Sequence, residues 1–260
     1  MKQKFSPDKA LGQHFLKDKS LIEKITSDFA SACDVIIEVG PGPGALTESL
    51  SQKNKPFYLI EFDSRFIENL TKWVSRDHIY EEDALNFDFK TISKLHPNQK
   101  IWLVSNLPYN ISAPLFLKFT QELEIQYMTL MFQKEVGDKT YPRADEKNQM
   151  NSLLTISMNF WKAKLLSKVK PGAFNPPPKV DSVVVSYERK TPEISDFHAF
   201  EKFSKNLFSL RRKQIGQSLK PLNLSVDEIS SFPVNPKLRA EALSYEQVLK
   251  LFDFFKKVRK

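Results

Sequence analysis

Short apolar runs alternate with polar, helix-compatible stretches in the first half of the chain, and this alternation restricts the fold more than any other feature. The runs cover residues 35–39, 57–62, 78–80, 101–104 and 127–132. Runs of this length predict buried strands, and strands that alternate with helices predict a parallel sheet covered on both faces. Ligands bind such sheets at the carboxyl ends of the strands, so the residues after each run are the candidates for function.

Two helical regions flank these runs. Residues 20–32 are predicted to form a helix, because Leu21, Ile25 and Phe29 are spaced to make one apolar face. Apolar residues at helical spacing return after a break at Thr-Pro-Glu, residues 191–193. We therefore predict an α/β domain over residues 1–191 and a smaller, all-helical domain over residues 192–260.

Basic residues are concentrated at the two ends of the chain. The 260 residues hold 39 Lys and Arg against 31 Asp and Glu, a net charge of +8. Residues 201–260 contain 13 basic and 6 acidic residues, and residues 1–20 contain 5 and 2. This distribution favours a small-molecule site flanked by a surface that binds a polyanion, although solubility alone also explains a mildly basic chain.

Several protein classes are excluded by what the sequence lacks. No run of 18 apolar residues occurs, and the basic N-terminus lacks the apolar core of a secretory signal. The single cysteine, Cys33, cannot form an internal disulfide, and there is no Cys/His cluster of the kind that holds zinc. We expect a soluble cytoplasmic protein with no membrane segment and no metal site.

A glycine-rich turn follows the first run, in the sequence Glu-Val-Gly-Pro-Gly-Pro-Gly-Ala-Leu-Thr that starts at residue 38. Gly40, Gly42 and Gly44 leave room for a ligand against bare backbone. The spacing differs from the G-x-G-x-x-G of dinucleotide sites, and Pro41 and Pro43 remove amide donors that a pyrophosphate would use. The turn indicates a ligand without a diphosphate, and a purely structural turn is about as probable on this feature alone.

Two acidic residues stand at the ends of the next two runs. Glu61 closes the second run, where a carboxylate can accept hydrogen bonds from both hydroxyls of a ribose. Asp83 follows the third run and is placed to bind the exocyclic amine of an adenine. Either acid alone reads as a surface charge, but together with the glycine turn they predict an adenosine pocket. The combination resembles class I S-adenosylmethionine-dependent methyltransferases, which implies a Rossmann-like α/β domain.

The fourth run ends in Asn106-Leu-Pro-Tyr, which resembles the (Asp/Asn)-Pro-Pro-Tyr motif of enzymes that methylate exocyclic amines. Such an amine is a poor nucleophile because its lone pair is delocalised into the ring. The side-chain oxygen of Asn106 and the carbonyl of Leu107 can accept its two N–H bonds and free the lone pair. Pro108 stiffens the turn and Tyr109 offers a face for the base. The alternative is an ordinary strand-to-helix turn in which Asn106 caps the helix.

A proline-stiffened loop, residues 171–182, carries one aromatic residue, Phe174. We expect Phe174 to be exposed and to clamp a flipped base from its second face. A loop with only a structural role would look the same.

These motifs resemble, in content and order, those of the ribosomal RNA adenine dimethylases, from about residue 9 to about residue 250. The segments that carry the resemblance are Leu11-Gly-Gln-His-Phe-Leu, the glycine turn, Asn106-Leu-Pro-Tyr-Asn-Ile-Ser, Gln133-Lys-Glu-Val, Phe174-Asn-Pro-Pro-Pro-Lys-Val-Asp-Ser and residues 207–219. Leu107 favours the housekeeping small-subunit branch. Two departures are Ser105, where glycine is common, and residues 141–160, which lack the usual Tyr-Gly-x-Leu-Ser pattern.

The resemblance implies N6-dimethylation of two adjacent adenines, in the loop of the 3′-terminal helix of 16S rRNA in an immature small subunit, by a monomeric enzyme. It implies S-adenosylmethionine as cofactor, with contacts from His14, Leu16, Gly40, Glu61, Asp83 and Asn106. The catalytic group is expected to comprise Asn106, Leu107, Pro108, Tyr109 and Phe174. The RNA phosphates are expected to contact the basic run Arg211, Arg212 and Lys213.

Two other functions fit the same motifs. The chain could be a large-subunit rRNA methylase of the macrolide-resistance type. It could also be a non-catalytic ribosome-assembly or transcription factor of the same fold, although every residue of the catalytic turn is present. A nicotinamide dehydrogenase is disfavoured by the proline-interrupted glycine turn.

Overall fold

The computed structural model describes residues 13–144, 146–147, 149–210, 212–219, 228 and 231–258. The chain divides into two compact units. The first comprises Met1–Gly137 and Ala163–Arg189, and the second comprises Asp138–Lys162 and Lys190–Lys260. The second unit therefore includes residues 138–162 as well as the C-terminal segment. The boundary at residue 191 and the rRNA-binding role of residues 192–260 stay predictions.

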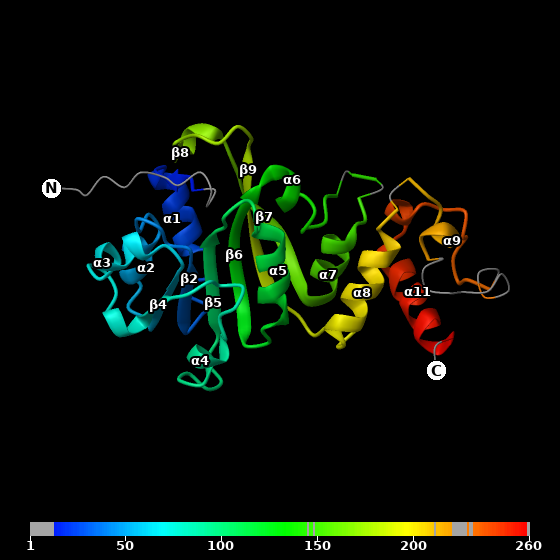
Figure 1. The fold of residues 1–260 in the computed structure, drawn as a ribbon, viewed down its shortest axis with the longest axis horizontal. Coiled ribbons are helices and arrows are strands. Elements are labelled where there is room, and N and C mark those ends of the chain that lie inside the picture. The colour runs from blue at the N-terminus through cyan, green and yellow to red at the C-terminus, as the bar shows by residue number, and fades with distance from the viewer. Residues whose placement is uncertain are drawn as a thin grey trace. The chain divides into compact units, whose positions relative to one another are not determined.

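Within the described residues a seven-stranded sheet forms the centre of the first unit, in the order β4-β3-β2-β5-β6-β9-β7 (Figure 1). Its strands are β4 (Ile79–Glu81), β3 (Phe57–Glu61), β2 (Val35–Val39), β5 (Ile101–Asn106), β6 (Ile125–Gln133), β9 (Ser182–Arg189) and β7 (Trp161–Val169). The pairs from β4 to β6 are parallel, whereas β9 is antiparallel to β6. The five apolar runs of the sequence are the five parallel strands, as predicted.

Helices cover both faces of this sheet, and for this reason most of its strands are buried on both sides. They are α1 (Lys19–Ser27), α2 (Thr47–Ser51), α3 (Ile67–Leu70), α4 (Lys90–Ser93), α5 (Ser112–Gln121) and α6 (Lys134–Gly137). One apolar cluster joins α1 to one face; its members include Leu21, Ile25, Leu59, Trp102 and Met131. On the other face, Phe116 of α5 lies 5.4 Å from Tyr187 and 6.3 Å from Phe132 between ring centroids.

A two-stranded sheet joins two distant segments of the first unit. β1 (Phe15–Leu16) pairs antiparallel with β8 (Phe174–Asn175), so that Leu16 lies opposite Phe174. The pairing continues beyond the strands, since the backbone amide of Lys17 donates to the carbonyl of Ala173 at 2.9 Å. Asp18 then caps α1 by accepting a hydrogen bond from the amide of Leu21 at 3.1 Å.

The second unit is built mainly from helices. They are α7 (Ser152–Phe160), α8 (Phe197–Leu207), α9 (Ile215–Ser218) and α11 (Tyr245–Val258). The core of the unit is aromatic: Phe252 of α11 lies 5.1 Å from Phe200 and 5.3 Å from Phe203 of α8. The phenylalanines at helical spacing after residue 196 are thus the residues that pack α8 against α11.

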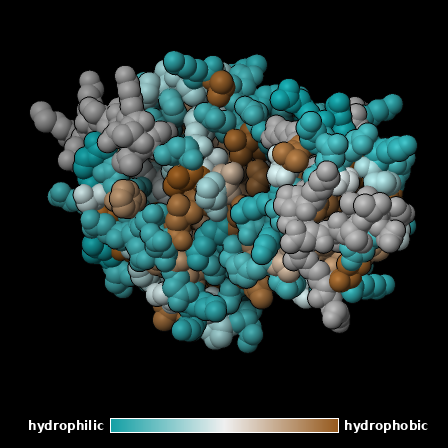
Figure 2. Space-filling view, turned by 45° about the vertical axis from the view of Figure 1, so that its right-hand side comes forward, coloured by the Kyte–Doolittle hydropathy of each residue, from teal (hydrophilic) through white to brown (hydrophobic). Residues whose placement is uncertain are grey.

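Most of the surface seen in Figure 2 is hydrophilic, with hydrophobic side chains gathered near the middle of the view. Large hydrophobic residues that are exposed include Phe62, Leu95, Leu123, Val180 and Leu210. No helix of the described residues is both long enough and apolar enough to cross a membrane.

Candidate active site

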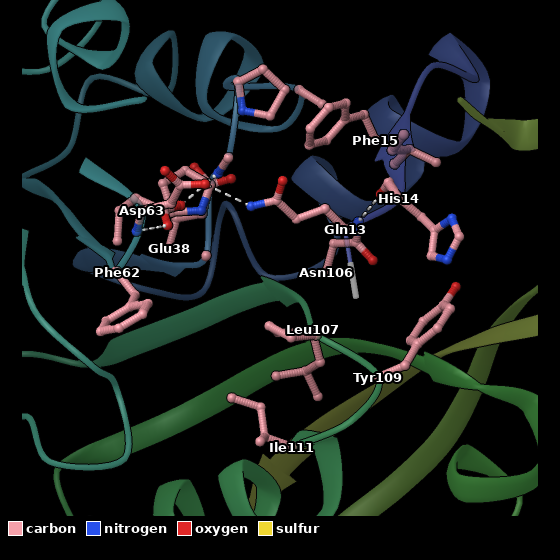
Figure 3. Close-up of a pocket in the computed structure, with 18 of the residues that line it drawn as sticks. Gln13, His14, Phe15, Glu38, Phe62, Asp63, Asn106, Leu107, Tyr109 and Ile111 are labelled. Carbon is pink, nitrogen blue, oxygen red and sulfur yellow. Dashed lines mark hydrogen bonds between the residues drawn. The ribbon is translucent and has the colours of Figure 1, made fainter. Parts of the chain in front are cut away.

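A cavity of about 290 Å³ lies at the carboxyl ends of β2, β3 and β5, in the first unit (Figure 3). The predicted cofactor contacts all line it, namely His14, Leu16, Gly40, Glu61, Asp83 and Asn106. Leu107, Pro108 and Tyr109 of the predicted catalytic turn line it as well. The strand-end argument predicted that Gly40, Glu61, Asp83 and Asn106 lie together, and the family resemblance added His14 and Leu16.

The glycine turn forms one wall of the cavity. Gly40, Gly42 and Gly44 all have positive φ angles, of 65°, 55° and 94°. A Cβ added at Gly40 would meet no atom within 4 Å, whereas one at Gly44 would lie 2.4 Å from the Trp73 ring. Gly44 is required by packing, and the backbone at Gly40 is left bare beside the space for a ligand.

Glu61 is held in place by the backbone around it. Its Oε2 accepts the amide hydrogen of Gly42 at 2.8 Å and its Oε1 that of Asp63 at 2.7 Å. Burial raises the pKa of Glu61, and these two hydrogen bonds oppose the shift. A carboxylate has about four acceptor positions, so an oriented Glu61 retains capacity for two hydroxyl donors.

Asp83 lies in the loop after β4 and is half-buried. Its Oδ1 accepts the amide hydrogen of Leu85 at 2.9 Å, which fixes the side chain beside the cavity. The contact of Asp83 with the amine of an adenine stays a prediction.

Asp63 is a lining residue that the sequence reasoning missed. Its Oδ2 accepts hydrogen bonds from Gln13 at 2.9 Å and from Arg65 at 2.5 Å. The Arg65 guanidinium holds the pKa of Asp63 below its usual range, so the side chain is charged at neutral pH. Gln13 comes from the segment that leads into β1, so Asp63 ties that segment to the end of β3. The only signal in the sequence was a second acid two residues after Glu61.

Glu38 is another lining residue that the sequence reasoning did not single out. Only 2% of it is exposed, and its Oε2 accepts a hydrogen bond from the Thr47 hydroxyl at 2.7 Å. Burial raises the pKa of Glu38 to about 8, and the neighbouring Glu61 adds to the shift. Glu38 is therefore largely protonated at neutral pH. A glutamate inside an otherwise apolar run was the signal that could have identified it.

Asn106 ends β5 with its amide group fixed in one orientation. Its Nδ2 donates to the backbone carbonyl of His14 at 3.1 Å. Because a carbonyl can only accept, this contact requires the NH₂ group there and leaves Oδ1 pointing away from it, on the Tyr109 side (Figure 3). The alternative that Asn106 caps a helix is wrong, since α5 begins at Ser112 with Ile111 as its N-cap.

Tyr109 is held by its hydroxyl group and by its ring. Its hydroxyl hydrogen bonds with the Ser182 hydroxyl at 2.7 Å, and burial raises the pKa of the phenol, which stays neutral. Its ring stacks on the His14 imidazole, with 5.5 Å between centroids and 30° between planes. The His14 ring is itself held by a 2.9 Å hydrogen bond between Nδ1 and the carbonyl of Pro176. His14 thus occupies one face of the ring that was predicted to receive a base.

The expectation that Phe174 is exposed is wrong. Only 1% of it is exposed, and it belongs to the apolar cluster that also contains Leu16. The reason is the pairing of β8 with β1: side chains alternate along a strand, so Phe174 points inward and Asn175 outward. Phe174 does not line the cavity; it packs in the same apolar cluster as Leu16 of β1 and is not free to clamp a base.

Of the three basic residues predicted to contact RNA, Arg212 and Lys213 are exposed in the second unit. Arg211 lies outside the described residues. Among the described residues, no group of three or more His, Cys, Asp or Glu side chains could hold a metal ion.

Comparison with known proteins gives consistent results. The family model described as ribosomal RNA adenine dimethylase matches residues 4–257. The chain is 34% identical, over 98% of its length and 99% of the relative's, to ribosomal RNA small subunit methyltransferase A of Francisella tularensis subsp. novicida.

Two solved structures share the fold across both units. A dimethyladenosine transferase from Plasmodium falciparum has a TM-score of 0.76 and 26% identity, covering 94% of this chain and 98% of that one. The 23S rRNA methyltransferase ErmE has a TM-score of 0.66 and 23% identity, covering 93% and 99%. These neighbours confirm the predicted Rossmann-like methyltransferase fold.

Proposed function

Because the chain belongs to the ribosomal RNA adenine dimethylase family, we propose that it transfers methyl groups to N6 of two adjacent adenines in the loop of the 3′-terminal helix of 16S rRNA. The family predicted from the sequence motifs is confirmed, and with it the class of the enzyme. We further propose that it acts in the cytoplasm as a monomer on the immature small subunit. The curated relative named after the small subunit supports this choice over a large-subunit target.

The family implies S-adenosylmethionine as methyl donor, and the cavity residues fit this cofactor. Gly40 leaves open backbone, Glu61 offers oriented acceptors for a ribose, and Asp83 offers an acceptor at the cavity wall for the amine of an adenine. The prolines of the turn suit a nucleoside without a diphosphate. When bound, the cofactor supplies a methyl group made electrophilic by its sulfonium. The chain contributes alignment and electrostatics.

One observation carries the proposal: the carbonyl of His14 fixes the Asn106 amide so that its oxygen is available as an acceptor. The Leu107 amide donates to the Met131 carbonyl at 3.2 Å, which holds the turn against β6. Neither Asn106 Oδ1 nor the Leu107 carbonyl accepts a hydrogen bond from another described residue. Two acceptors on adjacent residues match an amine with two N–H bonds, and holding both would turn the nitrogen lone pair away from the ring.

The Asn106→Ala variant tests this assignment. We expect its rate of methyl transfer into under-methylated small subunits, at saturating cofactor, to fall by on the order of 10²–10³, as when one oxyanion-hole group is removed. Gln99→Ala is the matched control, because it removes an exposed amide just before β5, at the opposite end of that strand. A near-normal rate for Asn106→Ala would refute the assignment.

The two alternative functions are separated by the product and by cofactor binding. Primer extension on both rRNAs shows which one is modified, and mass spectrometry identifies the nucleotide. Modification of the large-subunit rRNA alone would favour the macrolide-resistance type. Absence of transfer by a protein that binds the cofactor in calorimetry would favour a non-catalytic assembly factor.

A further inference from the structure

β7 is an edge strand of the main sheet, and one of its faces is basic. Lys164 and Lys168 are exposed, as is Lys170 directly after the strand. Side chains alternate along a strand, so Lys164 and Lys168 lie on one face of β7, and Lys170 follows at the end of the strand. Leu166, between them, and Val169, at the end of the strand, both contact the apolar cluster that contains α1, so β7 lies beside that cluster.

Few acidic side chains neutralise the charge of these lysines. The side-chain ammonium groups of Lys164 and Lys168 make no ion pair or hydrogen bond with any residue the structure describes. Lys170 forms an ion pair with Asp181 at 2.7 Å, but its side chain is 82% exposed. Exposed pairs of this kind contribute little to stability, so Lys170 can exchange its partner.

The basic face continues towards the candidate active site. Lys170 begins the turn η3 (Pro171–Ala173), since its carbonyl accepts the amide hydrogen of Ala173 at 3.0 Å. The carbonyl of Ala173 in turn accepts the amide hydrogen of the exposed Lys17. Lys17 follows directly on Leu16, a residue of the cavity wall. A chain of contacts therefore leads from the edge of the sheet to the cavity.

Lysines on an edge strand also prevent pairing with a second sheet, which is their usual role. That role needs charges on the strand alone. It does not account for the exposed Lys170 and Lys17, which contact the two ends of η3 through their backbones. Lys17 belongs to a different segment, next to Leu16 of the cavity wall. A polyanion that enters the cavity from this side would meet all four lysines.

We propose that Lys17, Lys164, Lys168 and Lys170 form a phosphate-binding track that holds the rRNA backbone beside the adenine being methylated. The proposal rests on the proposed function, because it takes rRNA as the substrate. Residues two apart on a strand are about 6.6 Å apart, so the three lysines of β7 and its end extend over about 20 Å. Their flexible stems present point charges, which suits phosphate contact without sequence readout.

The test is the salt dependence of RNA affinity for Lys164→Gln/Lys168→Gln/Lys170→Gln. Each phosphate contact that is lost should lower the slope of log affinity against log salt by about 1, so we expect a reduction of about 2 to 3. The control is Lys90→Gln/Lys94→Gln/Lys100→Gln, which removes the same charge from exposed residues in α4 and the loop before β5. Its slope should fall less, and calorimetric cofactor affinity should equal wild type in both variants.

A slope for the β7 variant equal to that of the control would overturn the proposal. If the triple variant aggregates, Lys168→Gln alone serves, with an expected reduction of about 1; a soluble Lys168→Gln with an unchanged slope would equally overturn it. Lys164→Arg/Lys168→Arg should keep the wild-type slope. Failure of the proposed function is distinguishable, because wild-type protein would then transfer no methyl group to small-subunit rRNA whatever its affinity for RNA.

Discussion

Glu38→Gln should stabilise the protein increasingly as the pH rises. The folded state keeps the Glu38 proton up to a pKa of about 8, whereas an unperturbed glutamate loses it near 4.5. Between these values the folded state binds more protons than the unfolded state, so wild-type stability falls with rising pH. The slope is about 1.4 kcal/mol per pH unit, and the whole window corresponds to about 5 kcal/mol. Glutamine has no such proton and can still accept the hydrogen bond from Thr47.

Urea unfolding across the pH range from about 4 to 9 measures the effect. The free-energy difference between variant and wild type should be small at the acid end and should grow through the window in favour of the variant. Glu48→Gln is the matched control, because Glu48 is exposed on α2 and should give a nearly constant difference. Parallel stability curves for Glu38→Gln and wild type would refute the reasoning, since they would mean that Glu38 is charged in the folded state.

Two further predictions concern stability. Gly44→Ala should lower the free energy of unfolding by about 3 kcal/mol or more in urea titrations, because a Cβ at φ 94° would lie 2.4 Å from the Trp73 ring; a loss under about 1 kcal/mol would contradict this. Arg189→Met should cost about 3 kcal/mol by the same measurement, because the partly buried guanidinium donates to carbonyl groups at the end of α5 and the start of β6, which would lose these partners. Arg76→Met, at an exposed arginine, is the control and should cost less than about 1 kcal/mol; equal losses would count against the role of Arg189.

The sequence predicted those parts of the site that depend on local pattern. The parallel strands follow from their apolar runs. The parallel topology then brings Gly40, Glu61, Asp83 and Asn106 together at the carboxyl ends of the strands. The antiparallel strands β9 and β7 were not predicted. Their position depends on pairing with β6 and with each other, which no local period specifies.

The prediction for Phe174 failed because its environment is supplied from far along the chain. A phenylalanine in a proline-rich loop looks exposed until β1, more than 150 residues earlier, pairs with it. Glu38 and Asp63 were missed for a related reason. Their importance lies in burial and in contacts with Thr47 and Gln13, and a residue type alone does not reveal either.

The pairing of β1 with β8 has a consequence for synthesis of the protein. Residues 13–16, which include His14 and Leu16, are translated well before their docking partner at Phe174–Asn175. Contacts between such distant segments form slowly, because a long loop must close first. Residues 13–16 therefore stay unpaired until Phe174–Asn175 has been translated, so the part of the cavity wall that they supply is completed only when nearly all of the first unit has been made.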